Sequence, residues 1–321
     1  MAHRKRMSAL LVLALCAVLS PAQAQAAAPA RSGQLLAARN QVNQWIECAG
    51  PTTGARPTPT PSNSSTSTAN VTPSPVPDVV PSAAPTVVLI PGLGASHTYW
   101  SSVRAQLLPT TRVCWYDRPG LGYSAWRTGT RTVNAGTHAK ELDALLTAAG
   151  ETGPFVIVGH SYGGLLARAY GQTFASRTAG MVLVDSSNAT QWQGFGKYWG
   201  EAGTLINMKK TQQVVYGLPQ LGRKPLIVIG AGMGNSSLWQ ANQASMAKLS
   251  KNSVHVTARF QYHVIMAYNP LIVTEGISEV VQAATAPTKT LTPCAANVAT
   301  IWAPRSGICG PRIFKVKKKK K

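Results

Sequence analysis

Acidic residues are scarce in this chain of 321 residues, where 10 Asp and Glu stand against 31 Lys and Arg and the formal net charge is +21. Any site that needs a carboxylate therefore has few candidates. The longest apolar run, Met7–Leu19, has about 13 residues, whereas a membrane-spanning helix needs roughly 20. The sequence shows no cluster of residues with metal-ligand spacing and no glycine-rich dinucleotide motif, so it implies no cofactor.

The first 26 residues have the three parts of a secretory signal peptide. His3–Arg6 is basic, Met7–Leu19 is apolar, and A-x-A sites end at Ala24 and Ala26. Cys16 follows the bulky Leu15 rather than a small residue, which disfavours a lipoprotein anchor. We therefore expect residues 1–26 to be removed and the mature protein to be secreted.

Basic residues are concentrated at the C-terminus. Seven lie among the last ten positions: Arg312, Lys315 and Lys317–Lys321. Such a tail favours binding to an anionic surface or wall polymer, and a solvated disordered end is the alternative interpretation. The other positive charges are spread along the chain and no nucleic-acid-binding module is visible, so we expect no specific nucleic acid partner.

Four cysteines remain after removal of the signal peptide: Cys48, Cys114, Cys294 and Cys309. An even number in an exported protein predicts two disulfides, although four cysteines allow three pairings. Cys294 and Cys309 are 15 positions apart in a segment punctuated by Pro and Gly, which favours a local bridge. Four N-x-S/T sequons would accept glycans in a eukaryotic host: Asn63, Asn70, Asn188 and Asn235.

The composition divides the chain into segments. Pro, Ser and Thr fill 22 of the 35 positions from 51 to 85, so this stretch cannot bury a core and is predicted to be a disordered insertion. The preceding segment, residues 27–50, is too short to fold alone and belongs to the domain that follows. That domain, residues 86–285, alternates between strand and helix patterns, and residues 286–321 form a C-terminal extension.

Six short apolar runs in this domain are typical of strands that are buried on both faces of a sheet. They are Thr86–Ile90, Arg112–Tyr116, Phe155–Val158, Met181–Val184, Leu226–Ile229 and Ser253–Ala258. Helical patterns separate them, including residues 137–149 before Gly150 and a last helix that starts at Asn269-Pro270. The alternation predicts an α/β fold with a doubly wound, mostly parallel sheet.

The strongest motif is Gly159-His160-Ser161-Tyr162-Gly163, a G-x-S-x-G sequence. It lies directly after a predicted strand and before a helical pattern, which is the context of a nucleophile elbow. A serine on such a strained turn leaves no room for side chains two residues away on either side, and glycines supply that room. The motif predicts Ser161 as a catalytic nucleophile.

A base and an acid must follow Ser161 if the chain order of such folds holds. Of the two later histidines, His255 lies inside a predicted strand, whereas His263 lies in the loop before the last helix and is the predicted base. Only Asp185 and Glu201 supply a carboxylate between Ser161 and His263. Asp185 directly ends a predicted strand and is the predicted acid, with Glu201 as the alternative.

A tetrahedral intermediate also needs two fixed N–H donors for its oxyanion. One predicted donor is the backbone N–H of Tyr162, the residue after the nucleophile. The other is the backbone N–H of Leu93, in the glycine-rich turn Pro91-Gly92-Leu93-Gly94.

Together these pieces resemble the serine esterase/lipase-like branch of the α/β-hydrolase superfamily. The matching segments are VVLIPGLGAS (87–96), RVCWYDRPGLGYS (112–124), VIVGHSYGG (156–164) and AGMVLVDSS (179–187). The resemblance implies that Ser161, Asp185 and His263 form a triad, and that a strand ending at Cys48 lies beside the strand of Cys114, so that the two sulfurs bond. Many relatives have His-Gly where this chain has Pro91-Gly92.

The segment after Asp185, at about residues 188–222, is predicted to be a small cap. Its aromatic residues either shape an apolar pocket or pack internally: Trp192, Phe195, Tyr198 and Trp199. The predicted function is hydrolysis of small or lipid-like carboxylic esters through an acyl-serine intermediate. Acyl transfer or thioester or amide cleavage on the same triad, and a non-catalytic ligand-binding or wall-attached protein of this fold, are the alternatives.

Overall fold

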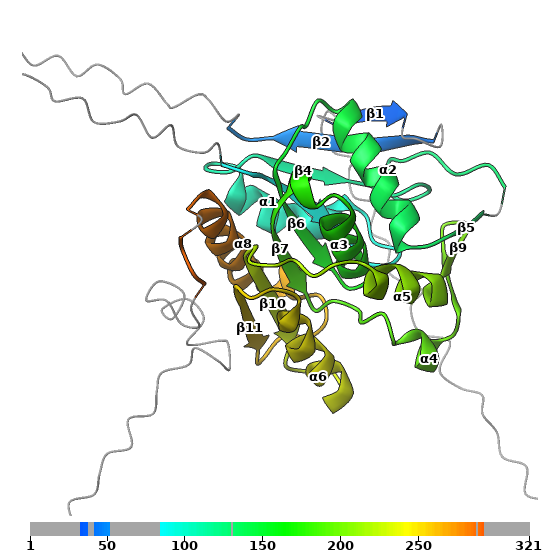
Figure 1. Cartoon of the computed structure of the whole chain (residues 1–321). Coiled ribbons are helices and arrows are strands. Elements are labelled where there is room, and N and C mark those ends of the chain that lie inside the picture. The colour runs from blue at the N-terminus through cyan, green and yellow to red at the C-terminus, as the bar shows by residue number, and fades with distance from the viewer. Residues whose placement is uncertain (1–32, 38–41, 52–83, 130, 287, 292–321) are drawn as a thin grey trace, which may run out of the picture. The chain divides into compact units, whose positions relative to one another are not determined.

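The computed structural model describes residues 33–37, 42–51, 84–129, 131–286 and 288–291. Their centre is an eight-stranded sheet in the order β1-β2-β4-β3-β6-β7-β10-β11 (Figure 1). The strands are β1 (Gln34–Ala37), β2 (Asn43–Ala49), β3 (Thr86–Ile90), β4 (Val113–Tyr116), β6 (Phe155–His160), β7 (Thr178–Val184), β10 (Leu226–Ala231) and β11 (Ser253–Ala258). β1 and β2 pair antiparallel, and the other six strands run parallel. The predicted doubly wound, mostly parallel sheet is confirmed.

The central strands are buried and mostly apolar because helices cover both faces of the sheet. Along β3, Val87 and Leu89 point to one apolar cluster and Val88 and Ile90 to the other, following the period of two of a strand. The first cluster includes residues of α1 (Ser101–Leu107), α7 (Ile265–Tyr268) and α8 (Pro270–Thr285). The second includes residues of α2 (Ala135–Ala148) and α3 (Tyr162–Thr173), which lie next to each other in Figure 1.

The ends of the helices follow local capping rules. α2 begins where the side chain of Asn134 accepts hydrogen bonds from the amides of Gly136 and Thr137, two residues before the predicted start. It ends before Gly150, whose φ of +80° suits the left-handed position after a helix. Asn269 precedes α8 as predicted, but its side chain makes no capping hydrogen bond.

A second sheet has three strands in the order β5-β9-β8, and two of them, β8 and β9, lie within the predicted cap. It consists of β5 (Arg131–Val133), β8 (Tyr198–Glu201) and β9 (Thr204–Asn207), and α4 (Trp192–Phe195) and α5 (Met208–Gly217) flank it in sequence. α6 (Ser237–Met246) follows β10. Three short 3₁₀ turns complete the described elements: η1 (His97–Trp100), η2 (Ala175–Arg177) and η3 (Ala247–Leu249).

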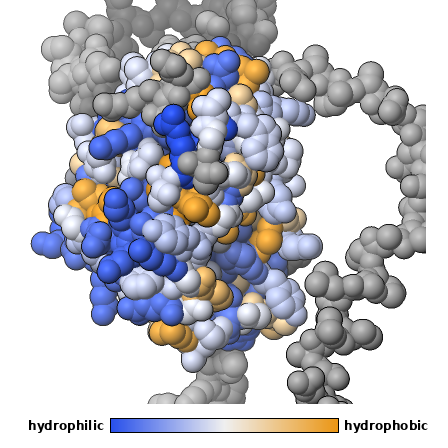
Figure 2. Space-filling view, turned by 90° about the vertical axis from the view of Figure 1, so that its right-hand side faces the viewer, coloured by the Kyte–Doolittle hydropathy of each residue, from blue (hydrophilic) through white to orange (hydrophobic). Residues whose placement is uncertain are grey.

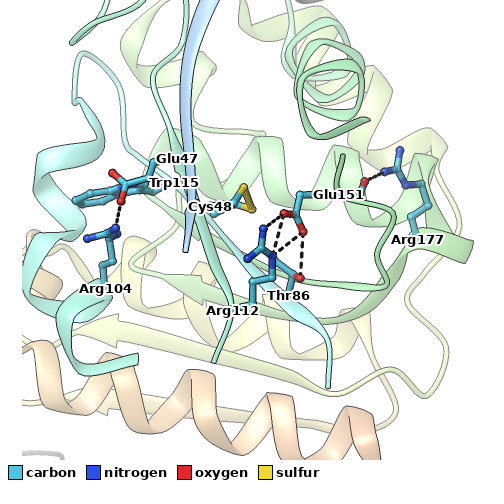
Figure 3. Close-up of a disulfide and its surroundings, with 9 residues drawn as sticks. Glu47, Cys48, Thr86, Arg104, Arg112, Trp115, Glu151 and Arg177 are labelled. Carbon is cyan, nitrogen blue, oxygen red and sulfur yellow. Dashed lines mark hydrogen bonds and ion pairs between the residues drawn. A yellow bond between two sulfur atoms is a disulfide. The ribbon is translucent and has the colours of Figure 1, made fainter. Parts of the chain in front are cut away.

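A disulfide joins Cys48 of β2 to Cys114 of β4, its direct partner in the strand register (Figure 3). The predicted pairing is therefore confirmed. Ion pairs reinforce the same region: Arg104 bonds to Glu47 beside Trp115, and Arg112 binds the carboxylate of Glu151 through three N–H···O contacts. The antiparallel edge is thus attached to the parallel sheet by covalent and ionic contacts.

Several predictions fall outside the described residues: the signal peptide, most of the insertion, the Cys294–Cys309 bridge, the basic tail, and the sequons at Asn63 and Asn70. The two described sequons do not favour glycosylation. Asn188 is 5% exposed, and Asn235 uses its Nδ2 atom to donate to a buried carboxylate.

Among the described helices, none has the length and apolarity needed to cross a bilayer. On the face drawn in Figure 2, hydrophilic residues divide the apolar surface into separate small groups, as is common for protein surfaces.

Candidate active site

Ser161 lies at a sharp turn between β6 and α3, with φ 52° and ψ −123°. A residue other than glycine rarely adopts a positive φ, so the turn is strained. The close packing explains the glycines of the motif: a Cβ atom at Gly159 would lie 2.3 Å from the carbonyl oxygen of Gly163, and one at Gly163 would lie 2.5 Å from that of Ile90. The turn lifts Ser161 to the edge of the sheet where the parallel strands end.

The structure brings the three residues of the predicted triad into one hydrogen-bonded line. The Nε2 atom of His263 lies 2.9 Å from Oγ of Ser161, and its Nδ1 atom lies 2.6 Å from Oδ2 of Asp185. The three follow β6, β7 and β11, whose carboxyl ends share one edge of the sheet. The Asp185 side chain is fully buried, whereas that of His263 is 40% exposed and so can meet a substrate.

The carboxylate of Asp185 is fixed by donors on both oxygen atoms. Oδ1 accepts from the amide of Ala231 at 2.9 Å and from Nε1 of Trp239 at 2.8 Å, and Oδ2 accepts from Nδ2 of Asn235 at 3.2 Å as well as contacting His263. Several hydrogen bonds on both oxygen atoms hold a carboxylate in one orientation. No sequence pattern marks Trp239 or Asn235 as a partner of this carboxylate.

Glu201, the alternative acid, contacts a different group. Its carboxylate binds the guanidinium of Arg118 at 2.7 and 2.8 Å and accepts from the amide of Gly94 at 2.8 Å. Burial raises the pKa of Glu201, but the charge and hydrogen bonds of Arg118 outweigh burial and lower that pKa to about 2. Glu201 is therefore an ionised partner of Arg118, and Asp185 is the carboxylate that contacts His263.

His160 holds the loop that carries His263. Burial, together with the nearby His263, lowers the pKa of His160 to about 3, so its ring is neutral. Its Nε2 atom lies 2.9 Å from the carbonyl oxygen of His263 and must carry the proton, because a carbonyl only accepts. His255, in contrast, lies within β11 opposite Val228, as the sequence predicts for a structural residue.

The two predicted oxyanion donors lie near Ser161. Tyr162 is the first residue of α3, so its backbone N–H has no partner in its own helix. Leu93 lies in the turn after β3 and lines the same pocket as Ser161. The pocket has a volume of about 420 Å³ and contains no charged side chain in its lining: Leu93, Ser161, Ser187, Gln191, Phe195, Trp199, Gly200 and Trp239.

The cap aromatics have different positions. Phe195 and Trp199 line the pocket, whereas Tyr198 is exposed and Trp192 donates through Nε1 to Gln212.

Another pocket, of about 590 Å³, lies where α2 meets α5 and contains none of the predicted site residues. Within the described part of the chain, one group has metal-ligand composition, but two of its three members are the disulfide-bonded Cys48 and Cys114.

Comparison with known proteins agrees with the observed fold. Residues 85–202 match the family model of the alpha/beta hydrolase fold, a range that includes β3, β4, the elbow and Asp185. The chain therefore has the α/β-hydrolase fold. A solved esterase from Thermogutta terrifontis superposes on this α/β-hydrolase-fold protein with a TM-score of 0.54 at 18% identity, covering 79% of this chain and 99% of that one.

Two sequence relatives match this α/β-hydrolase-fold protein over most of their own length. The uncharacterized protein YqjL of Bacillus subtilis is 28% identical over 221 residues, which are 62% of this chain and 84% of the relative. The putative carbamate hydrolase RutD of Klebsiella pneumoniae is 28% identical over 229 residues, or 67% of this chain and 82% of the relative.

Proposed function

We propose that this protein is a secreted serine hydrolase that cleaves carboxylic esters through an acyl-serine intermediate. The observation that carries the proposal is the hydrogen-bonded line from Ser161 through His263 to the buried Asp185. A serine hydroxyl is a weak nucleophile at neutral pH and needs an adjacent base. His263 is that base, and Asp185 fixes the tautomer in which Nδ1 carries the proton and Nε2 is free to accept one.

In the acylation half-reaction, Oγ of Ser161 attacks the ester carbonyl carbon while its proton moves to Nε2 of His263. The carbonyl oxygen becomes an oxyanion, which the backbone N–H groups of Tyr162 and Leu93 stabilise. As the intermediate collapses, the C–O bond to the alcohol breaks, and His263 gives its proton to the leaving alkoxide oxygen. The products are free alcohol and the Ser161 acyl ester.

Water completes the cycle by the reverse sequence. His263 takes a proton from a water molecule, the resulting hydroxide attacks the acyl carbon, and the bond to Oγ of Ser161 breaks. Nε2 then returns the proton to Oγ, and the carboxylic acid leaves. The carboxylate of Asp185 stabilises the positive charge on His263 in both halves.

The pocket favours neutral, apolar substrates of modest size. Its lining includes the rings of Phe195, Trp199 and Trp239, and Gln191 is the amide side chain among mostly apolar groups. No charged side chain of the lining would pair with a carboxylate or ammonium group on the substrate. We therefore assign esters with uncharged acyl groups, from short chains to a single aromatic ring.

Carbamate cleavage is the second candidate, and the name of the Klebsiella relative favours it. A carbamate also presents a carbonyl carbon to Ser161, but the group that departs from it is an amine or an alcohol. The chemistry needs the same nucleophile, base and oxyanion donors. Turnover of matched p-nitrophenyl esters and N-substituted carbamates would rank the two substrate classes.

The deciding experiment is covalent labelling with a fluorophosphonate probe. We expect the purified mature protein to label at one site and Ser161→Ala to remain unlabelled. The same pair, assayed on p-nitrophenyl esters of increasing chain length, should show a loss of about 10⁴-fold or more in Ser161→Ala. A wild-type protein that neither labels nor turns over any ester would be a binding protein that keeps this fold without its chemistry.

Export is part of the proposal and has its own support. The N-terminal residues have the pattern of a signal peptide, and the Cys48–Cys114 disulfide suits an oxidising compartment. Mass spectrometry of the protein from culture medium should find a new N-terminus after Ala24 or Ala26.

We also propose that the basic tail increases binding to anionic vesicles at low salt. Deletion of residues 315–321 should abolish this increase.

A further inference from the structure

We propose that Arg118 is a positioning residue for the oxyanion site: it fixes the backbone N–H of Leu93, and Glu201 of the cap holds Arg118 in place. This inference rests on the proposed function and names residues that the triad does not include. It derives from a buried ion pair whose hydrogen bonds converge on the turn Pro91-Gly92-Leu93-Gly94.

Arg118 makes four hydrogen bonds from a fully buried position. Nη1 donates to the carbonyl oxygen of Pro91 at 2.7 Å, and Nη2 donates to that of Gly92. Nε and Nη2 donate to the two carboxylate oxygens of Glu201 at 2.8 and 2.7 Å. The planar guanidinium therefore binds the turn on one side and the carboxylate on the other, in a fork geometry that a lysine ammonium cannot reproduce.

The bond to Gly92 bears directly on the oxyanion donor. The carbonyl group of Gly92 and the N–H group of Leu93 belong to the same planar peptide unit, and in a trans unit they point in opposite directions. A donor that fixes the Gly92 oxygen therefore fixes the direction of the Leu93 N–H. The cationic donor also polarises this peptide unit, which strengthens its N–H as a hydrogen-bond donor.

Glu201 holds the other end of the turn. Its Oε1 atom accepts from the amide of Gly94 at 2.8 Å, so the turn is bound on both sides of Leu93. The Glu201 carboxylate also supplies the negative charge that a buried guanidinium requires. Interaction with Glu201 outweighs burial and raises the pKa of Arg118, while the pKa of Glu201 is lowered, so both groups stay ionised.

The pair also connects the cap to the site. Glu201 ends β8 in the three-stranded cap sheet, whereas Arg118 follows β4 in the central sheet. The guanidinium carbon of Arg118 lies 5.6 Å from the ring centroid of Tyr162, whose backbone is the second predicted donor. The seating of the cap hairpin thus determines the orientation of at least one oxyanion donor.

The test uses Arg118→Lys and Glu201→Gln in the mature protein, with Arg127→Lys as the matched control. Arg127 forms an equally buried pair with Glu141 but has no hydrogen bond to the turn in the described structure. Three quantities are measured: kcat/KM on a p-nitrophenyl ester, the inhibition constant of a trifluoromethyl ketone, and the thermal midpoint. The active-site concentration used for kcat/KM comes from fluorophosphonate labelling. Ser161 adds to the ketone carbonyl and forms a hemiketal that carries an oxyanion. The affinity of the ketone therefore reports how well the oxyanion donors are placed.

We expect Arg118→Lys to lower kcat/KM by about 10- to 100-fold, because loss of a whole oxyanion donor costs about 10²- to 10³-fold. The inhibition constant should rise by a similar factor, since the ketone adduct mimics the intermediate. Glu201→Gln should change both quantities in the same direction by a smaller factor. Arg127→Lys should lower the thermal midpoint and leave both quantities within about threefold of wild type.

Two results would overturn the inference. One is an Arg118→Lys protein, or a Glu201→Gln protein if the first does not fold, whose kcat/KM stays within threefold of wild type. The other is a loss of kcat/KM without any change in the ketone's inhibition constant, which would make the pair merely structural. Failure of the proposed function is distinct, because in that case the wild-type protein itself would not react with the probe.

Discussion

The indole of Trp239 and the imidazole of His263 bind opposite oxygens of one carboxylate. Nε1 of Trp239 donates to Oδ1 of Asp185 at 2.8 Å, and Nδ1 of His263 lies 2.6 Å from Oδ2. The two rings also meet edge to face, with centroids 5.5 Å apart, and Trp239 lines the pocket beside Ser161. One side chain therefore donates to the carboxylate of Asp185, packs against the ring of His263 and lines the pocket beside Ser161.

Replacing this indole by a phenyl ring should separate these contributions. Trp239→Phe keeps an aromatic ring but removes the N–H donor to Asp185, and a hydrogen bond to a charged group is worth about 1.5–3 kcal/mol. We expect kcat/KM on a small ester such as p-nitrophenyl acetate to fall by about tenfold. Trp192→Phe is the control, because its Nε1 donates to Gln212 in the cap instead. Equal activities of the two variants would contradict a role for the Trp239 N–H.

Asp185→Asn should reduce ester turnover by about 10⁴-fold while the fold is kept, because an amide favours the wrong tautomer of its histidine partner. The matched control is Asp143→Asn. Asp143 also accepts hydrogen bonds from a tyrosine and an arginine, Tyr170 and Arg177, but on the surface of α2 away from the pocket. Steady-state kinetics and circular dichroism on both variants would check the prediction, and full activity of Asp185→Asn would exclude Asp185 as the acid.

The stability of the protein should fall as the pH drops below about 6.5. Burial lowers the pKa of both His138 and His160 to about 3, whereas an unfolded histidine titrates near 6.5. The unfolded chain therefore binds more protons between these values, and each histidine costs about 1.4 kcal/mol of unfolding free energy per pH unit. The stability is fully present above pH 6.5.

Urea unfolding at pH 7.5, 6.5, 5.5 and 4.5 measures this dependence. We expect a plateau at the two higher values and a decline below them. His138→Gln, which preserves an acceptor for the hydroxyl of Tyr162, should make the decline shallower by about 1.4 kcal/mol per unit. A variant with an unchanged slope would show that His138 does not titrate on unfolding.

Removal of the Cys48–Cys114 bridge should lower stability without changing chemistry. The two cysteines are 66 positions apart, and closing a loop of that length is worth about 4 kcal/mol in the chain-entropy model. We expect Cys48→Ala/Cys114→Ala to unfold at lower urea concentration and to keep wild-type kcat at 25 °C, since neither cysteine lines the pocket. A large loss of kcat in the folded variant would instead link the sheet edge to the site.

The strands of the central sheet were predictable because burial on both faces makes each one a continuous apolar run. Thr86–Ile90 and Ser253–Ala258 have the bounds that the sequence predicts, and the other four differ by a few residues at their ends. The strands of the second sheet, β5, β8 and β9, were not predicted. They are three or four residues long, and polar or glycine positions interrupt them, so they carry no periodic signal.

The line of Ser161, Asp185 and His263 could be predicted because each residue follows a recognisable strand. The supporting contacts could not, because they join residues from distant elements. Arg118 stands directly after Asp117 at the end of a buried strand, which marks it as unusual but does not reveal its partner 83 positions away in the cap. Trp239 lies on an ordinary polar helix, and nothing in its neighbourhood points to a carboxylate 54 positions earlier.

The disulfide between β2 and β4 also determines whether the two fragments stay together after a single cleavage of the backbone. Cleavage of any peptide bond between Cys48 and Cys114 yields two polypeptides that still share a covalent link. The fragment that ends after β2 therefore stays paired with β4 in its original register, and all residues of the predicted triad remain on the other fragment. A molecule nicked within residues 51–85 would run as one band in non-reducing electrophoresis, separate into two after thiol treatment, and keep the residues of the predicted triad together on one sheet.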